Sequence, residues 1–232
     1  MQTKKILISI AMVLFLVGIT HAGMVIQQFS SGAEPPAHLF YWDGESTSAD
    51  VTAGTTTGII EGNGTFTTGN GGYGGSGEAY DNVDDGSSDI YFPIADITGF
   101  DISDFTLTLY FNVQTLADYE YMFGIGADTS NYYQAHVYAN GRVYCRSEVA
   151  GTEYFGYIAG SGNEITASTW HKLEVVVNES TDTFTMTLDD TYTYTAPTFT
   201  ESFSGTPTYI YFGARYQGSD ELDTLIDEVT ID

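Results

Sequence analysis

Residues 105–113 read Phe-Thr-Leu-Thr-Leu-Tyr-Phe-Asn-Val, and this stretch decides the fold class. Every second position carries a large apolar side chain, at Phe105, Leu107, Leu109, Phe111 and Val113. Successive side chains of a β-strand point to opposite faces of a sheet, so this alternation predicts a strand with one buried face.

Similar short runs rich in Val, Ile, Thr, Tyr and Phe follow along the chain, at residues 170–177, 184–188, 209–214 and 225–231. Gly, Asn, Asp and Ser interrupt them at fairly regular intervals, and no helical pattern occurs after residue 38. Asn140-Gly141 predicts a hairpin with a type I′ turn, because glycine tolerates a positive φ, and Asp189-Asp190 predicts a second tight turn. The sequence therefore predicts an all-β sandwich or barrel.

The N-terminus has the order of a secretory signal peptide. Lys4 and Lys5 precede an apolar run over residues 6–19, which is shorter than a membrane-spanning helix needs, and small residues lead up to Ala22. We expect cleavage after Ala22, with an uncleaved N-terminal anchor as the alternative. Residues 1–22 are then the signal peptide, residues 23–37 a flexible lead-in, and residues 38–232 one domain that works outside the cell or in the periplasm.

Charge excludes several classes of partner. All 31 acidic residues lie after the signal peptide, where only four basic residues remain, so the formal charge of the mature chain is −27. Nucleic acid and anionic membrane surfaces are poor partners for such a protein. Cys145 is the only cysteine, so no intramolecular disulfide is possible and the fold depends on its core.

Several segments together resemble a known family. They are Ser88 to Pro93, Asp104 to Leu109, Thr169 to Val175, Leu188 to Asp190 and Leu225 to Ile231. In this order they look like a laminin G-like domain of the concanavalin A-like lectin/glucanase superfamily, over roughly residues 38 to 232. The resemblance implies a jelly roll of two antiparallel sheets, used as a carbohydrate-binding or adhesive module with a structural Ca²⁺ ion. It does not name the ligand.

Asp227 is the first candidate for that calcium site. Strand alternation would put it on the same face as Leu225, Val229 and Ile231, pointing into the core, where an ionised carboxylate needs a partner. Calcium favours six to eight oxygen ligands, and Asp43 is a candidate second contributor. The alternative is that a bulge or hydrogen bonds satisfy Asp227 at the strand end.

The chain has 18 tyrosines, an unusually high number. A tyrosine offers a flat face to the apolar C–H side of a sugar and a hydroxyl to its edge. The candidate ligand-binding residues on predicted strands are Tyr110, Tyr121, Tyr138, Tyr144 and Tyr157, with Tyr154 and Tyr211 as further members of the set. The alternative is that strands simply favour tyrosine for packing.

Two enzymatic alternatives remain open on the same fold. Glucanases of the superfamily carry three clustered acids on one strand, but here Leu225 and Ile226 follow Glu221 and Asp223 where the third acid would stand. Alginate lyases of this fold use residues that resemble Gln134, His136, Arg146 and Tyr211. However, the order of the motifs is reversed in this chain, and a lysine expected near Tyr211 is absent.

We therefore expect a secreted, non-catalytic module that binds a polysaccharide or glycoprotein, with neutral polymers favoured because the acidic surface repels polyuronates. A polysaccharide lyase or hydrolase is the enzymatic alternative. The third reading is a structural subunit of an extracellular layer or filament, whose tyrosines pack against other copies.

Overall fold

A computed structural model describes residues 38–51, 54–67, 71–75, 77–82, 89–117, 119–158, 162, 164–195, 201–216 and 223–232. The predicted signal peptide and lead-in lie outside the described residues. Within the described part of the chain, the only helices are three short 3-10 turns, η1 (Tyr73–Gly75), η2 (Ile94–Asp96) and η3 (Glu179–Thr181). None of these helices is long and apolar enough to cross a bilayer.

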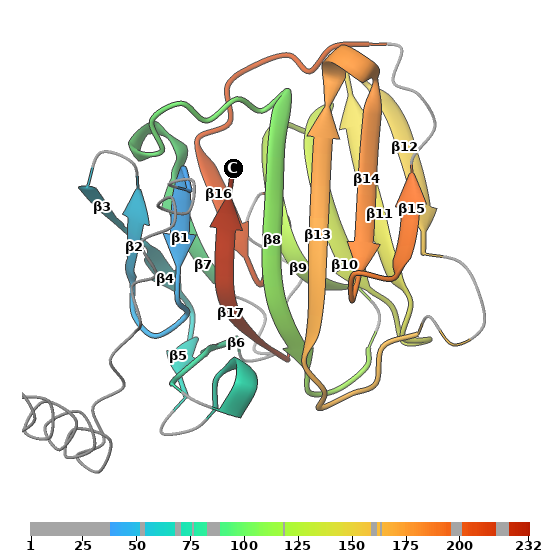
Figure 1. Ribbon diagram of the computed structural model, residues 1–232. Coiled ribbons are helices and arrows are strands. Elements are labelled where there is room, and N and C mark those ends of the chain that lie inside the picture. Colours follow the sequence, from blue (N-terminus) through green and yellow to red (C-terminus); the bar gives the residue numbers. More distant parts are fainter. Residues whose placement is uncertain are drawn as a thin grey trace, which may run out of the picture. The chain divides into compact units, whose positions relative to one another are not determined.

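The first sheet has ten strands (Figure 1). Its main path runs through β15 (Tyr192–Thr195), β14 (Thr183–Leu188), β13 (His171–Asn178), β8 (Asp104–Val113), β17 (Thr224–Ile231), β1 (Phe40–Trp42), β2 (Ser48–Val51) and β3 (Gly54–Thr57). Two short strands, β5 (Thr65–Phe66) and β6 (Tyr80–Asn82), extend from β17. Residues 105–113 therefore lie in β8, a central strand of this sheet.

The second sheet has seven strands and lies behind the first in Figure 1. Its order is β12 (Thr152–Tyr157), β11 (Val143–Val149), β10 (Asn131–Val137), β9 (Glu120–Asp128), β16 (Tyr209–Phe212), β7 (Asp89–Pro93) and β4 (Ile59–Glu61). The described pairings in both sheets are antiparallel, from the β1–β17 pair to the β5–β6 pair. The predicted sandwich of two antiparallel sheets is confirmed.

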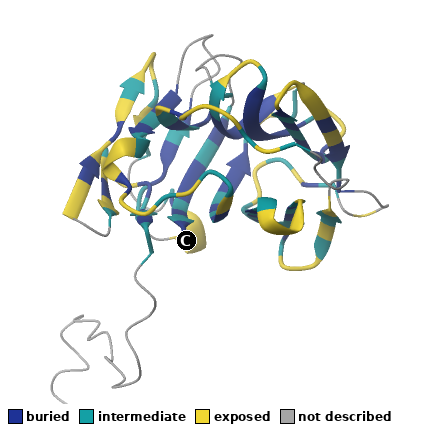
Figure 2. Ribbon diagram, turned by 90° about the horizontal axis from the view of Figure 1, so that it is seen from above, coloured by how far each residue is buried: buried dark blue, intermediate teal, exposed yellow. Residues whose placement is uncertain are grey.

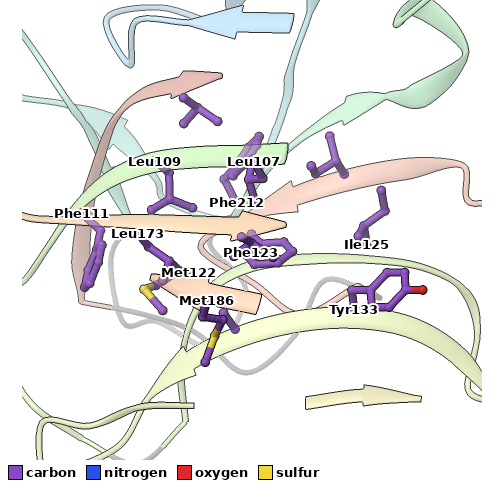
Figure 3. Close-up of a cluster of buried hydrophobic side chains, with 14 of the residues drawn as sticks. Leu107, Leu109, Phe111, Met122, Phe123, Ile125, Tyr133, Leu173, Met186 and Phe212 are labelled. Carbon is purple, nitrogen blue, oxygen red and sulfur yellow. The ribbon is translucent and has the colours of Figure 1, made fainter. Parts of the chain in front are cut away.

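The core lies between the two sheets. Figure 3 shows Leu107, Leu109 and Phe111 of the first sheet facing side chains of the second, among them Phe123 and Phe212. All five of these side chains have no exposed surface. Full burial of one such side chain contributes about 1.5–3 kcal/mol to folding, so a core of this size can hold the domain without a disulfide. Figure 2 shows the same division, with buried residues in the strands and exposed residues mainly in the loops.

The two predicted tight turns form, but the one at Asn140-Gly141 differs from the expected type I′ geometry. Asn140-Gly141 lies in a hairpin loop where Gly141 alone has a positive φ, of 74°, and its N–H bonds to the carbonyl of Tyr138. The prediction of a type I′ turn is therefore wrong, because that turn needs a positive φ at both central residues. Asp189 and Asp190 do have positive φ values, of 51° and 54°, and make the I′-like turn between β14 and β15.

Strand β17 contains a bulge that corrects the predicted position of Asp227. The register shifts between Asp227 and Thr230, and Glu228 has a φ of 49°. On the N-terminal side of the shift, Ile226 rather than Leu225 is buried in the core. Asp227 pairs with Tyr110, whose side chain points away from the core, so Asp227 lies on the outer face. The predicted burial of Asp227 is confirmed, but turn residues cover it and the core does not.

Candidate functional site

A hollow of about 800 Å³ lies on the outer face of the seven-stranded sheet. Its lining is mostly aromatic, with one ion pair: Tyr119, His136, Tyr138, Tyr144, Arg146, Glu153 and Phe155. These residues come from the end of the sheet formed by β9 to β12 and from the segments that flank those strands.

Strand alternation places the lining residues on this face. In β11, Val143 and Cys145 are buried in the core, and the side chains between and after them, Tyr144 and Arg146, point outward. Burial raises the pKa of the Cys145 thiol to about 12, so the thiol is protonated at neutral pH. Because directly opposed residues of antiparallel strands share a face, the register then fixes the neighbours of the two outward side chains.

The register sets two transverse rows across the sheet. In the first, Tyr144 lies between His136 of β10 and Tyr157 of β12. In the second, Arg146 lies between Gln134 of β10 and Phe155 of β12. Three of the four residues of the lyase resemblance, namely Gln134, His136 and Arg146, are thus brought together.

The rings form a continuous aromatic surface. The ring centroid of Tyr144 is 5.5 Å from that of His136, with an interplanar angle of 10°, and 5.4 Å from that of Phe155. Tyr157 packs at 5.1 Å from Tyr144 on the other side. Phe155 is 54% exposed, although an aromatic ring of that size is normally covered. The surface therefore offers a flat apolar ring to a ligand.

Two buried polar side chains of β10 have unmet hydrogen-bonding capacity: His136, which lines the hollow, and Gln134, two residues before it. His136 is 1% exposed and Gln134 is 2% exposed. Among the described residues, neither ring nitrogen of His136 has a hydrogen-bond partner, nor has Oε1 of Gln134. A buried polar atom without a partner costs about 1–3 kcal/mol, so these atoms favour a ligand or water that would satisfy them.

His136 is neutral at physiological pH. Burial, together with the nearby positive charge of Arg146, lowers the pKa of its imidazole to about 4. The neutral ring has one donor and one acceptor nitrogen, which suits an uncharged hydroxyl better than an ion.

The charged groups of the hollow form a pair. Nε of Arg146 donates to Oε1 of Glu153 at 2.7 Å, and both side chains are partly exposed. The guanidinium also lies 5.9 Å from the ring centre of Tyr132. The pair presents donors and acceptors side by side without a net charge.

Tyr211 lies apart from this hollow. In the sheet register it is opposite Gly124, which in turn is opposite Gln134, but the backbone of Arg215 and Tyr216 crosses the face at that point. A Cβ atom added to Gly124 would clash with this backbone, at 2.8 Å or less from three of its atoms. Glycine at 124 therefore makes room for the crossing segment, which separates Tyr211 from His136.

A smaller hollow of about 300 Å³, the Tyr211 hollow, contains Tyr211 together with Tyr209 and Tyr216. Burial, together with the nearby carboxylate of Asp89, raises the pKa of Tyr211 to about 12. Its phenol is therefore protonated at neutral pH, so it can donate a proton but is not available to abstract one.

The other tyrosines predicted to bind ligand do not all lie at the hollow of about 800 Å³. Tyr138 and Tyr144 line the hollow, and Tyr157 lies beside it with the guanidinium of Arg142 at 5.1 Å from its ring centre. Tyr121 is buried against His136, at 5.1 Å between ring centroids. Tyr110 belongs to the other sheet. Tyr154 points into the core and donates to Glu201 at its edge.

Sequence reasoning missed three lining residues, Tyr119, Glu153 and Phe155. The alternation of β12 could have identified two of them, because Glu153 and Phe155 share a face with Tyr157. Tyr119 precedes β9 and has a φ of 66°, so no strand pattern predicts its position.

The candidate calcium residues lie close together but are engaged by backbone groups. Oδ2 of Asp227 accepts the N–H of Tyr73 at 2.7 Å, and Oδ1 accepts the N–H of Glu228 at 2.9 Å. Asp43 accepts the N–H of Glu45, and the neighbouring Gly44 lies against Asp227. No group of three or more His, Cys, Asp or Glu side chains suited to a metal occurs among the described residues. These acids alone do not form a calcium site, and calcium stays a prediction.

A laminin G family profile, described as the concanavalin A-like lectin/glucanases superfamily, matches residues 84–231. The chain belongs to this superfamily. The resemblance seen in the sequence is thereby confirmed, and the superfamily accounts for the two antiparallel sheets. No curated protein sequence matches the chain.

Solved structures of similar fold include domain 4 of AbnA, an extracellular arabinanase from Geobacillus stearothermophilus, in complex with arabinotriose. It has a TM-score of 0.61 and 16% identity, and the match covers 84% of this chain and 91% of that one. The binding domain of Paraclostridial Mosquitocidal Protein 1 has a TM-score of 0.62 and 15% identity, over 84% of this chain and 48% of that one.

The binding domain of Botulinum neurotoxin DC, in complex with rat synaptotagmin II, has a TM-score of 0.62 and 9% identity, again over 84% and 48% of the two chains. This chain therefore spans about half the length of the two toxin domains. At these identities, the likeness to all three structures shows the fold alone.

Proposed function

We propose that the domain is a secreted, non-catalytic module that binds the glycan of a polysaccharide or glycoprotein in the hollow formed by β9 to β12. The observation that carries the proposal is the arrangement of exposed rings beside buried polar atoms without partners. Phe155 and Tyr144 offer apolar faces. His136, which stacks on Tyr144, and Gln134, two residues before it on β10, have unmet hydrogen-bonding capacity.

A sugar ring has both features in complementary form. Its C–H face packs against an aromatic ring, and the hydroxyls at its edge donate and accept hydrogen bonds. The Arg146–Glu153 pair at the side of the hollow adds donors and acceptors for further hydroxyls. A volume of about 800 Å³ accommodates a short oligosaccharide.

Neutral glycans are the preferred class. The charges in the hollow form a pair, the imidazole is neutral, and the surrounding protein is strongly acidic. A polyanion would meet long-range repulsion without an unpaired cation in the hollow to offset it. The arabinotriose complex of the similar AbnA domain supports a neutral saccharide as the first ligand class to test.

Binding to immobilised or gel-embedded neutral polysaccharides, followed by calorimetry with the matching oligosaccharides, tests the proposal. Phe155→Ala should weaken binding at least ten-fold because it removes an exposed stacking ring, and its exposure makes a folding defect small. Tyr209→Ala, on the same sheet but in the smaller hollow, is the matched control and should leave the affinity unchanged. Equal affinities for both variants, or no binding across a broad panel of neutral glycans, would contradict the proposal.

A further inference from the structure

A second aromatic cluster lies on the opposite side of the sandwich. Strand β8 buries Leu109 and Phe111 in the core, so Tyr110 between them points outward from the ten-stranded sheet. The ring of Tyr73 lies on Tyr110 at 3.8 Å between centroids, with an interplanar angle of 31°. Trp170 meets Tyr73 edge-on at 6.0 Å. Tyr110, predicted from the sequence to bind ligand, therefore belongs to a site of its own.

Polar groups border these rings on one side. His171 contacts Asp189 at 2.8 Å, and Nζ of Lys172 donates to Asp190 at 2.7 Å. The three rings and these two pairs line a hollow of about 220 Å³. The composition matches that of the first hollow, which also joins stacked rings to a paired cation and carboxylate.

Tyr73 is held in place although its ring is 41% exposed. Its backbone N–H bonds to the buried carboxylate of Asp227, which fixes the turn that carries the ring. Four large hydrophobic side chains are exposed among the described residues, Ile59, Tyr73, Tyr119 and Phe155. Two of them line the first hollow and Tyr73 lines this one, so the exposed rings concentrate at the two hollows.

We propose that this second hollow binds one neutral sugar unit and makes the domain bivalent. The sugar's C–H face packs on Tyr73 and Trp170, and its hydroxyls bond to Lys172, Asp190 and their neighbours. Its small volume suits a single ring rather than an oligosaccharide. The two hollows lie on the outer faces of different sheets, which point in opposite directions, so one molecule can join two glycan chains and gain avidity on a surface that presents many of them.

Tryptophan fluorescence reports this site selectively. The chain has two tryptophans: Trp170 lines the second hollow, and Trp42 is fully buried in the core with its N–H bonded to the carbonyl of Ser46. We would titrate the full mature chain with arabinotriose, xylotriose, cellotriose and maltotriose and follow the emission. We expect a saturable change with at least one probe, and its loss in Trp170→Phe.

Three variants separate this site from the first. Tyr73→Ala should weaken the fluorescence-detected binding at least ten-fold, whereas Tyr73→Phe keeps the ring and should retain it. Phe155→Ala should leave the Trp170 response intact while it removes binding in the first hollow. Near-ultraviolet circular dichroism checks that each variant keeps its fold.

Bivalency has a readout of its own. The wild-type protein should aggregate beads coated with a polymer of the responsive sugar, and both Tyr73→Ala and Phe155→Ala should bind the beads without aggregating them. A Trp170 signal that none of the four probes changes would overturn the second site, whatever the first hollow binds. A response that Tyr73→Ala leaves unaltered would overturn it as well.

Discussion

The buried carboxylate of Asp227 accepts the backbone N–H of Tyr73 at 2.7 Å, across 154 positions of sequence. The bond ties an exposed turn to the bulge of strand β17 and holds the Tyr73 ring on Tyr110. Burial raises the pKa of Asp227 to about 6, so the bond has a cost: near neutral pH the carboxylate is charged in a poorly solvated place.

Asp227→Ala should lower the free energy of unfolding by about 2–3 kcal/mol, because it leaves the N–H groups of Tyr73 and Glu228 without an acceptor. Asp227→Asn should cost less, since it keeps one acceptor oxygen. Urea unfolding measures both, and hydrogen exchange at the Tyr73 amide should be faster in the alanine variant. Asp50→Ala, at an exposed strand position, is the control. Equal unfolding midpoints for the two Asp227 variants would argue against the bond's role.

Removal of calcium tests whether Asp227 also binds a metal ion. If Asp227 and Asp43 bind Ca²⁺ together with carbonyl oxygens, a strong chelator should lower the melting temperature, because an ion bound only by the folded state stabilises it. Asp227→Ala should then melt identically with and without the chelator. An unchanged melting temperature of the wild-type protein in the chelator would show that bound calcium does not stabilise the domain.

The sequence predicted most of the fold, because alternation in segments such as 105–113 depends only on which face is buried. It misplaced Asp227 because a bulge shifts the register by a backbone distortion at Glu228 that no side-chain pattern encodes. For the site, the sequence named Tyr144 as ligand-binding and His136 as part of the lyase alternative, but it grouped Tyr110 with Tyr144. Only the pairing of strands into two separate sheets shows that Tyr110 lies on a different face. That pairing joins residues far apart in the sequence, so a local pattern does not encode it.

His136 should make stability depend on pH. Its folded pKa of about 4 lies below the ordinary 6.5, so between these values the unfolded chain binds more protons and stability rises with pH. The gain is complete above pH 6.5, is lost as pH falls toward 4, and amounts to at most about 3 kcal/mol.

Asp227 contributes the opposite slope between pH 3.8 and about 6, so the comparison must be made between variants. His136→Phe should lack the rise that the wild-type protein shows from pH 4 to 6.5. Gln134→Ala, which alters a nearby buried position on the same strand without removing a titrating group, should keep it. Parallel pH profiles for wild type and His136→Phe would show that the imidazole is not buried in the neutral form.

The predicted signal peptide can be tested on secreted material. Lys4, Lys5, the apolar run and the small residues before Gly23 all favour cleavage after Ala22. The intact mass should therefore correspond to a chain that begins at Gly23. Material that retains residues 1–22 and stays with the membrane fraction would favour the uncleaved anchor.

The last prediction separates binding from catalysis in the first hollow. A polysaccharide lyase needs a base that abstracts a proton from the sugar and a group that protonates the leaving oxygen. Gln134, His136 and Arg146 lie together, but the segment at Arg215 separates Tyr211 from them. We therefore expect no rise in ultraviolet absorbance, the signal of unsaturated sugar ends, when alginate or other uronic-acid polymers are incubated with the protein.

His136→Ala sharpens this test, because proton transfer acts in the transition state and ligand binding in the ground state. If the domain only binds, the variant should weaken the retention of a neutral glycan, and absorbance should stay flat for both proteins. If the domain is a lyase, the wild-type protein should release unsaturated products steadily, and His136→Ala should stop their release while leaving much of the substrate affinity. Tyr211→Phe should have no effect on glycan retention, because its ring lies in the separate hollow that it shares with Tyr209 and Tyr216. Product formation that depends on both His136 and Tyr211 would show that the segment between them moves aside, and would make the domain an enzyme.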